Sequence, residues 1–318
     1  MNSQTIFADR VYGHTLAEMG AQVPELVVLD SDLQRATEAN LFQEQFPERY
    51  FNIGVQEANM VGMAAGLALS GKKVFCGSFA CFMSQRVLDQ AAISVAYCRA
   101  NVKLVGIEAG LSSGRNGASH QAMLDLAVYR ALPNMSVLVP ADAVETRQIV
   151  EYLALEHQGP AYLRIQRKRV PVVLEETYRF SFGQAGLLRQ GGDLTIMASG
   201  IMVARALSAA ETLAQNGIHV RVLNFSTYKP LDREAVLSAA EETGAVVVAE
   251  NHSVFGGLYG AVSEVLAAAN PVPVNSVAIE DVFGEVGDET YLAQKFGLTE
   301  EDIVGAAQDV LLRKRAMR

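Results

Sequence analysis

The sequence predicts an α/β protein of two doubly wound domains, each built on a mostly parallel sheet. Short apolar runs of strand length alternate with helical stretches along most of the 318 residues, which is typical of parallel sheets covered on both faces. The chain is long for one domain, and its apolar period is lost over 171–192, where glycines accumulate. We therefore expect domains at 1–170 and 193–318, with 171–192 as a linker or an edge hairpin.

The first domain is expected to open with an amphipathic helix at 8–20 that ends at Gly20. A helix that starts at Glu57 is expected to end at Gly71, because glycine commonly closes a helix. The remaining predicted elements are strands at 26–29, 74–76, 102–107, 136–139 and 161–165 and helices at about 85–97, 122–130 and 143–157.

The second domain repeats the pattern. A strand at 194–197 leads through Ser199-Gly200 into a helix at 202–216. Gly256-Gly257 could mark a phosphate loop at a helix start, but the lysine and threonine of a nucleotide-binding loop are missing, so this signal is weak. Further strands are predicted at 220–223, 245–250 and 274–277.

Composition and charge argue against several classes of protein. The net charge is −9 with no long run of either sign, which argues against a nucleic-acid-binding surface. No segment has the apolar length needed to span a bilayer, and the first ten residues lack the pattern of a signal peptide. Cys76, Cys81 and Cys98 lie in apolar surroundings without metal-ligand spacing, so we expect buried free thiols. A cytoplasmic protein without nucleic-acid or membrane partners is the expectation.

Glu57 is an unusual charged residue, because it stands at the start of an almost wholly apolar helix. Apolar side chains recur from Met60 to Leu69 at spacings of three and four, the period of a largely buried helix. The helix dipole favours a carboxylate in the first turn, whereas burial among Val, Met and Ala favours the protonated carboxyl. Such a group suits proton exchange near neutral pH, although the position alone would also fit a cap that faces water.

Two phenylalanines follow this helix in a loop of small residues. Phe79 and Phe82 come shortly after the predicted strand at 74–76. An acidic side chain beside an aromatic pair could hold a flat heterocycle, with the rings on its face and the carboxyl on a ring nitrogen. These segments together form the first candidate site.

The stretch from 51 to 82 resembles the pyrimidine-binding domain of thiamine-diphosphate enzymes. The match is strongest to the C-terminal half of transketolase as it occurs in split, two-subunit transketolases, and it runs from about residue 10 to the C-terminus. Gly54-Val55-Gln56-Glu57 matches the family's Gly-hydrophobic-x-Glu motif. The resemblance implies that Glu57 hydrogen-bonds N1′ of the cofactor's aminopyrimidine and promotes its imino form.

Three more residues acquire cofactor-binding roles from the resemblance. Phe79 and Phe82 match the aromatic wall around the pyrimidine, with Phe82 preferred as the stacking partner. Asp32 matches an aspartate of an Ala-Asp-Leu segment that helps to hold the cofactor. On position alone, Asp32 would be read equally well as a residue that starts a turn.

The resemblance also implies substrate contacts. Arg10 and Arg167 fall on arginines that grip the substrate phosphate, and a guanidinium fork suits a phosphate or a sulfonate. His120 matches a histidine near the reacting carbons, where an imidazole could exchange a proton with a sugar hydroxyl. Without the resemblance, Arg10 and the four cations among 164–169 would be read as solvated, and His120 as a histidine in the glycine-serine loop 109–121.

Four positions depart from the family's pattern. Asn116 stands for an aspartate, Arg115 for a glutamate, and Glu108 for a histidine, while Ala36 stands where a serine assists phosphate binding. Asn116 keeps a hydrogen-bonding side chain and remains a substrate-binding candidate, whereas Glu108 brings negative charge to a phosphate-contacting position. We therefore expect a substrate other than the ordinary pentose and hexose phosphates.

One part of the family's cofactor site is missing. The Gly-Asp-Gly motif that binds the metal of the diphosphate is not found, and Gly191-Gly192-Asp193 has the wrong order. The resemblance implies thiamine diphosphate and Mg²⁺ as cofactors, with no metal ligand here and the metal bound mainly by a separate N-terminal, diphosphate-binding subunit. An α2β2 heterotetramer is the expected assembly, because paired halves normally assemble about a two-fold axis.

The implied activity is that of a transketolase, a transferase of carbohydrate metabolism that moves a two-carbon ketol unit from an anionic ketose to an aldose acceptor. The ketose could be phosphorylated or sulfonated. Three alternatives remain: a 2-oxo-acid dehydrogenase β subunit or deoxyxylulose-phosphate-synthase-like enzyme, a non-catalytic regulatory or scaffolding paralogue, and a structural module without a small ligand. The last two are disfavoured because five matching residues occur together, namely Asp32, Glu57, Phe79, Phe82 and His120.

Overall fold

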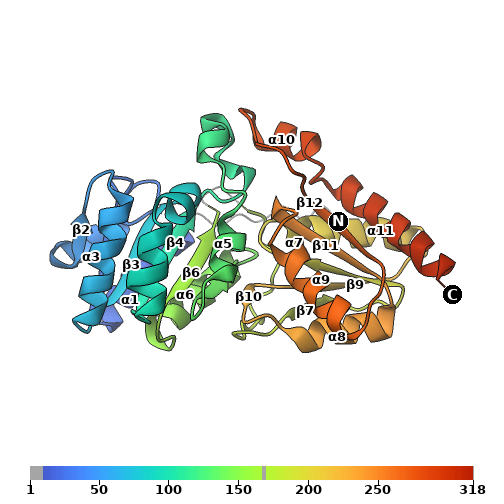
Figure 1. Ribbon diagram of the computed structural model, residues 1–318, viewed down its shortest axis with the longest axis horizontal. Helices are drawn as coiled ribbons and strands as arrows, with labels where there is room; N and C mark the ends of the chain where they lie inside the picture. Colours follow the sequence, from blue (N-terminus) through green and yellow to red (C-terminus); the bar gives the residue numbers. More distant parts are fainter. Residues whose placement is uncertain (1–9, 167–169, 318) are drawn as a thin grey trace.

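The computed structural model describes residues 10–166 and 170–317. It contains two α/β domains that lie side by side (Figure 1), one around a seven-stranded sheet and one around a five-stranded sheet. The strand order is β10-β5-β6-β4-β3-β1-β2 in the first sheet and β12-β11-β8-β9-β7 in the second. The predicted α/β class with two mostly parallel sheets is confirmed.

The first domain follows the predicted alternation of strands and helices. Its strands are β1 (Leu26–Asp30), β2 (Tyr50–Asn52), β3 (Lys73–Phe79), β4 (Val102–Ile107), β5 (Ser136–Leu138) and β6 (Ala161–Ile165). Its α-helices are α1 (Val11–Gln22), α2 (Asn40–Gln45), α3 (Glu57–Leu69), α4 (Leu88–Gln90), α5 (Asp125–Ala131) and α6 (Ala143–Leu155). Shorter or irregular helical turns are η1 (Pro47–Arg49), η2 (Phe82–Arg86), η3 (Ala91–Tyr97), η4 (Leu111–Asn116) and η5 (Ala118–His120).

The second domain has the same organisation. Its strands are β7 (Gly186–Arg189), β8 (Leu194–Ala198), β9 (Val220–Asn224), β11 (Val246–Ser253) and β12 (Val274–Ile279), while β10 (Thr227–Lys229) crosses to the first sheet. Its helices are α7 (Met202–Gln215), α8 (Arg233–Thr243), α9 (Leu258–Ala269), α10 (Glu289–Lys295) and α11 (Glu300–Ala316).

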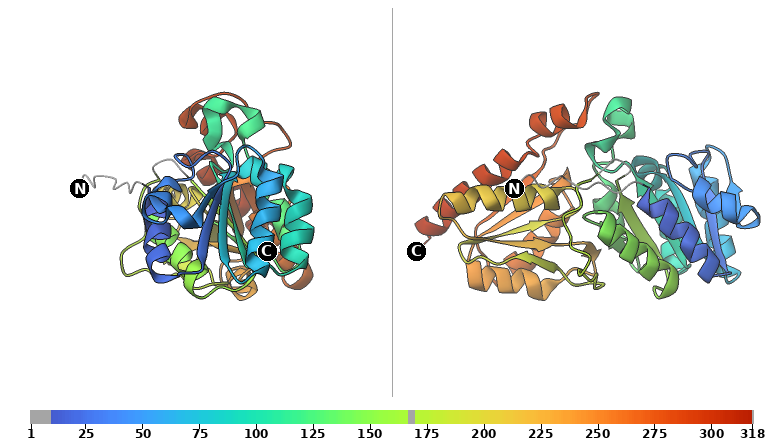
Figure 2. Two further views of the ribbon diagram at one scale, coloured as in Figure 1. Left: turned by 90° about the vertical axis from the view of Figure 1, so that its left-hand side faces the viewer. Right: turned by 180° about the vertical axis from the view of Figure 1, so that it is seen from behind.

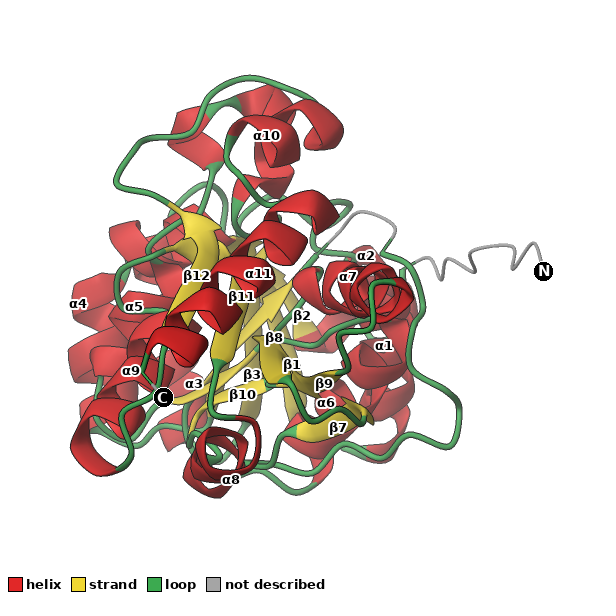
Figure 3. Ribbon diagram, turned by 90° about the vertical axis from the view of Figure 1, so that its right-hand side faces the viewer, coloured by secondary structure: helices red, strands yellow, loops and turns green. Residues whose placement is uncertain are grey.

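Each sheet is covered by helices on both faces. In the first domain α1 and α6 pack together on one face, and α3, η3 and α5 cover the other. In the second domain α7 and α11 cover one face, and α8 and α9 the other, as Figure 3 shows from that end of the molecule. Alternate residues of a strand face opposite layers, so Phe75 enters one core and Val74 the other. The α3 layer and the α8–α9 layer share one continuous apolar core.

Two strands complicate the division into domains. β7 lies within 171–192 and joins the second sheet antiparallel to β9. β10 comes from the second half of the chain, yet it pairs antiparallel with β5 at the edge of the first sheet. The boundaries 1–170, 171–192 and 193–318 therefore stay a prediction.

Several local expectations differ from the structure. The helix expected at about 85–97 is divided into η2, α4 and η3. Cys76 and Cys81 are buried free thiols as predicted, but Cys98 is exposed at the end of η3. Within 10–166 and 170–317, none of the helices combines the length and the apolar character that crossing a bilayer requires.

Candidate active site

The candidate site lies at one edge of the first sheet, where β1, β3 and β4 end. These strands are parallel neighbours, with Asp30 opposite Gly77 and Phe79 opposite Ile107. Parallel strands bring the segments after their carboxyl ends to the same edge of the sheet, which is where open α/β sheets bind ligands. The segments that carry Asp32, Phe82 and the loop 109–121 all start from this edge.

Glu57 is the first residue of α3, and its side chain is 1% exposed. It therefore does not face water as a simple cap would. Ser78 donates a hydrogen bond to Glu57 Oε1 over 3.4 Å, and the Ser78 hydroxyl receives one from Ser31 at 2.8 Å. Arg86 Nη1 lies 2.9 Å from Glu57 Oε2. The carboxylate is thus buried, yet its partners are side chains rather than the backbone.

Asp32 is tied to the strand that precedes α3. Asn52 Nδ2 donates to Asp32 Oδ1 over 2.8 Å, and Asn52 Oδ1 accepts from the Gly54 backbone over 2.9 Å. Asp32 has a φ of 65°, in the left-handed region that few side chains adopt, and its side chain is exposed. Its carboxylate is therefore held at the surface beside the turn that leads to Glu57.

Asp30, at the end of β1, supports the loop that carries Asp32. It is fully buried and accepts hydrogen bonds from the Leu33 backbone and the Thr37 hydroxyl. Burial raises the pKa of Asp30 to about 6, against the opposing effect of those two hydrogen bonds. Asp30 therefore shapes the loop that presents Asp32.

The aromatic residues and His120 form one cluster. The rings of Phe79 and Phe82 are 5.9 Å apart at 76°, and the His120 ring lies 5.6 Å from Phe79 and 5.1 Å from Phe82. All three side chains are half-buried. Ser119 Oγ lies 3.0 Å from His120 Nδ1, which leaves Nε2 as the second ring nitrogen for another partner. The structure thus brings together two residues predicted for the cofactor and one predicted for catalysis.

The loop that carries His120 is supported by the second domain. Asn251 Oδ1 accepts a hydrogen bond from the Leu111 backbone over 3.2 Å. Gly110 has a φ of +60°, and a Cβ there would lie 2.3 Å from Asn251, so glycine is required at this position. Gly287 donates to the Gly114 carbonyl over 3.1 Å, and the loop and the segment before α10 project side by side from the two domains (Figure 2).

A buried ion pair holds the base of the loop. Arg164 Nε lies 2.7 Å from Asp125 Oδ2, and its Nη2 donates to the carbonyls of Ala122 and Asn251 at 3.1 and 2.9 Å. Arg164 is 4% exposed, so its assignment to a solvated cationic face is wrong. Burial lowers the pKa of the adjacent His252, whose Nε2 lies 3.9 Å from Asp125 Oδ1. Both domains therefore fix where the loop 109–121 starts and ends.

Asn116 lies in a wide, acidic cleft between the loop and α10. Asn116 Nδ2 donates to Ser113 Oγ over 3.2 Å, and its side chain is otherwise exposed. The cleft has a volume of about 640 Å³ and is bordered by Glu108, Asp288 and Glu289. Arg115 is the one cation among the described residues that line it.

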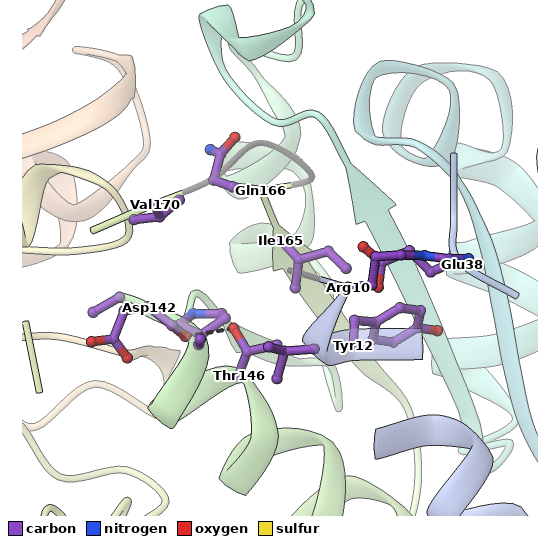
Figure 4. Close-up of a pocket in the computed structure, with 12 residues that line it drawn as sticks. Arg10, Tyr12, Glu38, Asp142, Thr146, Ile165, Gln166 and Val170 are labelled. Carbon is purple, nitrogen blue, oxygen red and sulfur yellow. Dashed lines mark hydrogen bonds between the residues drawn. The ribbon is translucent and has the colours of Figure 1, made fainter. Parts of the chain in front are cut away.

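Arg10 lines a separate small pocket. It precedes α1 with a φ of 53°, and its Nη2 donates to Asn40 Oδ1 over 2.5 Å. Figure 4 shows Arg10 beside Glu38 at one end of this pocket and Gln166 at the other. Glu38 is fixed there, because its Oε2 accepts a hydrogen bond from the Gly13 backbone over 2.8 Å. Arg167, the second predicted anion-binding residue, lies outside the described residues.

The start of α9 in the second domain shows what Gly256-Gly257, considered above as a possible phosphate loop, does in the fold. Glu250 Oε2 accepts from the Leu258 backbone over 2.7 Å, and its Oε1 accepts from Tyr259 over 2.8 Å. A Cβ on Gly257 would lie 2.1 Å from Glu250 Oε2. The amino end of α9 is thus occupied by a protein carboxylate, and the glycine allows that close approach.

Sequence reasoning missed Arg86, although a signal was present. Arg86 stands four residues after Phe82, the spacing at which helical side chains meet. Its guanidinium carbon lies 4.0 Å from the centre of the Phe82 ring, while its Nη1 contacts Glu57. Ser31 and Ser78 were missed as well, and no sequence pattern marks them.

Comparison with known proteins agrees with this geometry. The family model described as "Transketolase, pyrimidine binding domain" matches residues 5–172, and the model described as "Transketolase, C-terminal domain" matches residues 166–303. Together they cover most of the chain. The overlap of the two models near residue 170 coincides with the segment between β6 and β7.

Relatives of nearly the same length are similar over almost the whole chain. A 6-deoxy-6-sulfo-D-fructose transketolase subunit of a Clostridium species is 48% identical over 95% of this chain and 94% of its own length. An apulose-4-phosphate transketolase subunit of Phocaeicola vulgatus is 38% identical over 96% of this chain and 98% of its own length.

A solved structure agrees with these relatives. The structure titled "Split gene transketolase, inactive beta4 tetramer" superimposes with a TM-score of 0.88 at 46% identity, covering 96% of this chain and 98% of that one. The alternative of a 2-oxo-acid dehydrogenase or synthase is not favoured by these matches. The chain belongs to the transketolase family, and its relatives group it with the subunits of split transketolases that carry the pyrimidine-binding and C-terminal domains.

Proposed function

We propose that this chain is the pyrimidine-binding subunit of a thiamine-diphosphate-dependent transketolase that moves a two-carbon ketol unit from an anionic ketose to an aldose acceptor. The observation that carries the proposal is the buried Glu57 carboxylate, which Arg86 links to the Phe82 ring, with the His120 ring 5.1 Å from that of Phe82. A carboxyl, two aromatic rings and an imidazole of the family's motif thereby lie at one sheet edge.

The described residues fit the aminopyrimidine part of thiamine diphosphate. The protonated carboxyl of Glu57 would donate a hydrogen bond to ring atom N1′, Phe82 would stack on the ring, and Asp32 and Phe79 would border it. When bound, this cofactor supplies the carbon nucleophile that the side chains of proteins lack. His120 would exchange a proton with a sugar hydroxyl, and Asn116 would donate a hydrogen bond to the sugar from the cleft side.

The charge distribution supports an anionic ketose whose charged group lies away from the acidic cleft. The carboxylate of Asp288 at the cleft would disfavour a phosphate or sulfonate there, while carboxylate oxygens suit sugar hydroxyls. Arg10 lies in the other pocket, and we assign it and Arg167 to the anionic group. The names of two relatives, a sulfofructose and an apulose-phosphate transketolase subunit, support a sulfonate or phosphate.

An exposed face supports a partner subunit in direct contact with the half-site. α3 and η3 pack side by side, and neither 58–70 nor 91–97 contains a charged residue. Met63 is 41%, Ile93 59% and Tyr97 78% exposed, an unusual amount for apolar side chains on neighbouring helices. A Cβ at Gly62 or Gly66 would have open space, so another helix could approach closely here. We assign this face to the N-terminal, diphosphate-binding subunit.

The proposed assembly is an α2β2 heterotetramer in the cytoplasm, with Mg²⁺ bound mainly by the partner subunit. The lack of a Gly-Asp-Gly motif supports a second subunit as the source of the metal ligands. The similar structure whose title describes an inactive tetramer of β chains supports the idea that such a chain self-associates without its partner.

Calorimetry tests the proposal directly. Thiamine diphosphate with Mg²⁺ should bind a mixture of this chain and its N-terminal partner subunit, and it should not bind measurably to this chain alone. Sulfonated and phosphorylated ketoses are then screened as donors with the mixture. Tight binding by the chain alone would contradict the two-subunit site, and absence of binding by the mixture would contradict the cofactor assignment.

A further inference from the structure

Arg86 occupies the space that the proposed cofactor needs. It ends the irregular turn η2 and folds back over Phe82, with its guanidinium carbon 4.0 Å from the ring centre. The same guanidinium reaches Glu57, with Nη1 2.9 Å from Oε2. The guanidinium of Arg86 therefore covers the Phe82 ring and pairs with the Glu57 carboxylate at the same time.

This guanidinium has the flat shape of the group proposed to bind here, although it donates hydrogen bonds to Glu57 whereas the pyrimidine N1′ accepts one. An aminopyrimidine has a flat face and a ring nitrogen at its edge, and a guanidinium likewise has a flat face and N–H groups at its edge. Both can stack on Phe82 while directing a nitrogen at Glu57. Two planar groups cannot occupy one place, so one must leave before the other binds.

We propose that Arg86 is an internal stand-in for the aminopyrimidine: it fills the Glu57–Phe82 site before the cofactor binds and swings out when the cofactor enters. This inference rests on the proposed function, because it requires the pyrimidine to bind between Glu57 and Phe82. The stand-in pairs the buried charge of Glu57 and covers the Phe82 ring while the cofactor is absent.

The structure allows this movement. The Arg86 side chain is 47% exposed, so it can leave toward solvent without disturbing the core. Glu57 is 1% exposed and fixed at the start of α3, so the carboxylate stays in place for the incoming ring. The guanidinium is the exposed partner and its cation–π contact is weak, so Arg86 competes with the cofactor without blocking it.

Competition has a measurable consequence. The apparent affinity of a ligand falls in proportion to the fraction of protein in the binding-competent state. Removal of the Arg86 side chain raises the binding-competent fraction of the protein to one. The Arg86→Ala variant should therefore bind thiamine diphosphate more tightly than the natural chain, although it has lost a cation near an anionic cofactor.

The experiment uses the complex reconstituted with the partner subunit and Mg²⁺. Calorimetry should give thiamine-diphosphate binding about three- to thirtyfold tighter for Arg86→Ala than for the natural chain, and stopped-flow measurements should give faster association. Arg86→Lys should fall between them, because an ammonium keeps the charge and loses the planar stack. Arg233→Ala, at an exposed position of α8 in the other domain, is the matched control and should bind as the natural chain does.

The outcomes separate this inference from the proposed function. Unchanged or weaker binding by Arg86→Ala, with binding by the natural complex intact, overturns the stand-in and leaves the cofactor assignment standing. Absence of binding by both complexes overturns both. Tighter binding by Arg86→Ala supports both, and urea unfolding of the two chains checks that the gain does not follow from a change in stability.

Discussion

Glu57 and Glu250 each place a buried carboxylate at the amino end of a helix, but the two carboxylates have different hydrogen-bond partners. Glu250 accepts hydrogen bonds from two backbone N–H groups of α9 and also contacts the Tyr228 hydroxyl at 3.3 Å. Glu57 contacts the hydroxyl of Ser78 and the guanidinium of Arg86, both of which can rotate away. A carboxylate held by the backbone of its own fold is structural, whereas one held by movable side chains is open to exchange with a ligand.

The largest expected effect is the loss of activity on replacement of Glu57. Glu57→Gln should lower ketol transfer by the reconstituted complex about 10²- to 10⁴-fold, because an amide cannot take up the proton that the carboxylate handles. The measurement is steady-state turnover with saturating thiamine diphosphate. Glu48→Gln, at an exposed position of the same domain, is the control and should be fully active. A fully active Glu57→Gln complex would contradict the catalytic assignment.

The second effect concerns stability rather than activity. Glu250→Gln should lower the free energy of unfolding by about 1–3 kcal/mol, because the amide group faces a backbone N–H and leaves a buried donor unpaired. Urea unfolding of the chain measures this difference. Glu264→Gln, which loses an ion pair with Arg130 from an exposed position on α9, should change stability by less than about 1 kcal/mol. Equal effects of the two substitutions would contradict the structural role assigned to Glu250.

A third effect, which depends on pH, concerns the buried base His157 at the opposite end of the strands. Burial, and then the Lys103 ammonium 2.9 Å from Nδ1, lowers the pKa of His157 to about 4. The unfolded chain therefore binds more protons than the folded one between about pH 6.5 and 4, and stability falls as the pH falls through that window.

The measurement compares the pH dependence of unfolding in three chains. His157→Gln should lose about 1–3 kcal/mol less than the natural chain between pH 6.5 and 4, because the glutamine does not titrate. His219→Gln, at an exposed position, should follow the natural chain. Parallel curves for all three chains would show that His157 does not contribute to the acid sensitivity.

The sequence was sufficient to predict the helices and strands whose own residues show the apolar pattern of that element. Strands at 102–107 and 161–165 were predicted with the bounds that β4 and β6 have, because each is a buried, mostly apolar run between helices, interrupted by one cation. β2, β7 and β10 were not predicted as separate strands. Each has three or four residues, and pairing with a neighbour rather than an internal pattern makes it a strand.

Residues of the candidate site could be predicted from the sequence only where the residue type and its place in a helix or strand indicate its role. The position of Glu57 at the start of an apolar helix fitted either a buried carboxyl or a cap that faces water, and its 1% exposure agrees with the buried one. Arg164 and Arg86 were different, because the sequence shows a cation but not the carboxylate that pairs with it. Arg164 finds Asp125 thirty-nine residues away, and Arg86 finds Glu57 twenty-nine residues away. Such distant pairs depend on the folded topology.

The crossing of β10 determines how the chain can be divided. Thr227 and Lys229 pair with Leu138 and Val137, so the first sheet takes its last strand from the second half of the sequence. A fragment cut near residue 170 would leave the edge of β5 unpaired, and bare sheet edges promote aggregation. Expression of either half by itself is therefore unfavourable. Fragments and fusions of this protein should keep 10–317 together as a single unit.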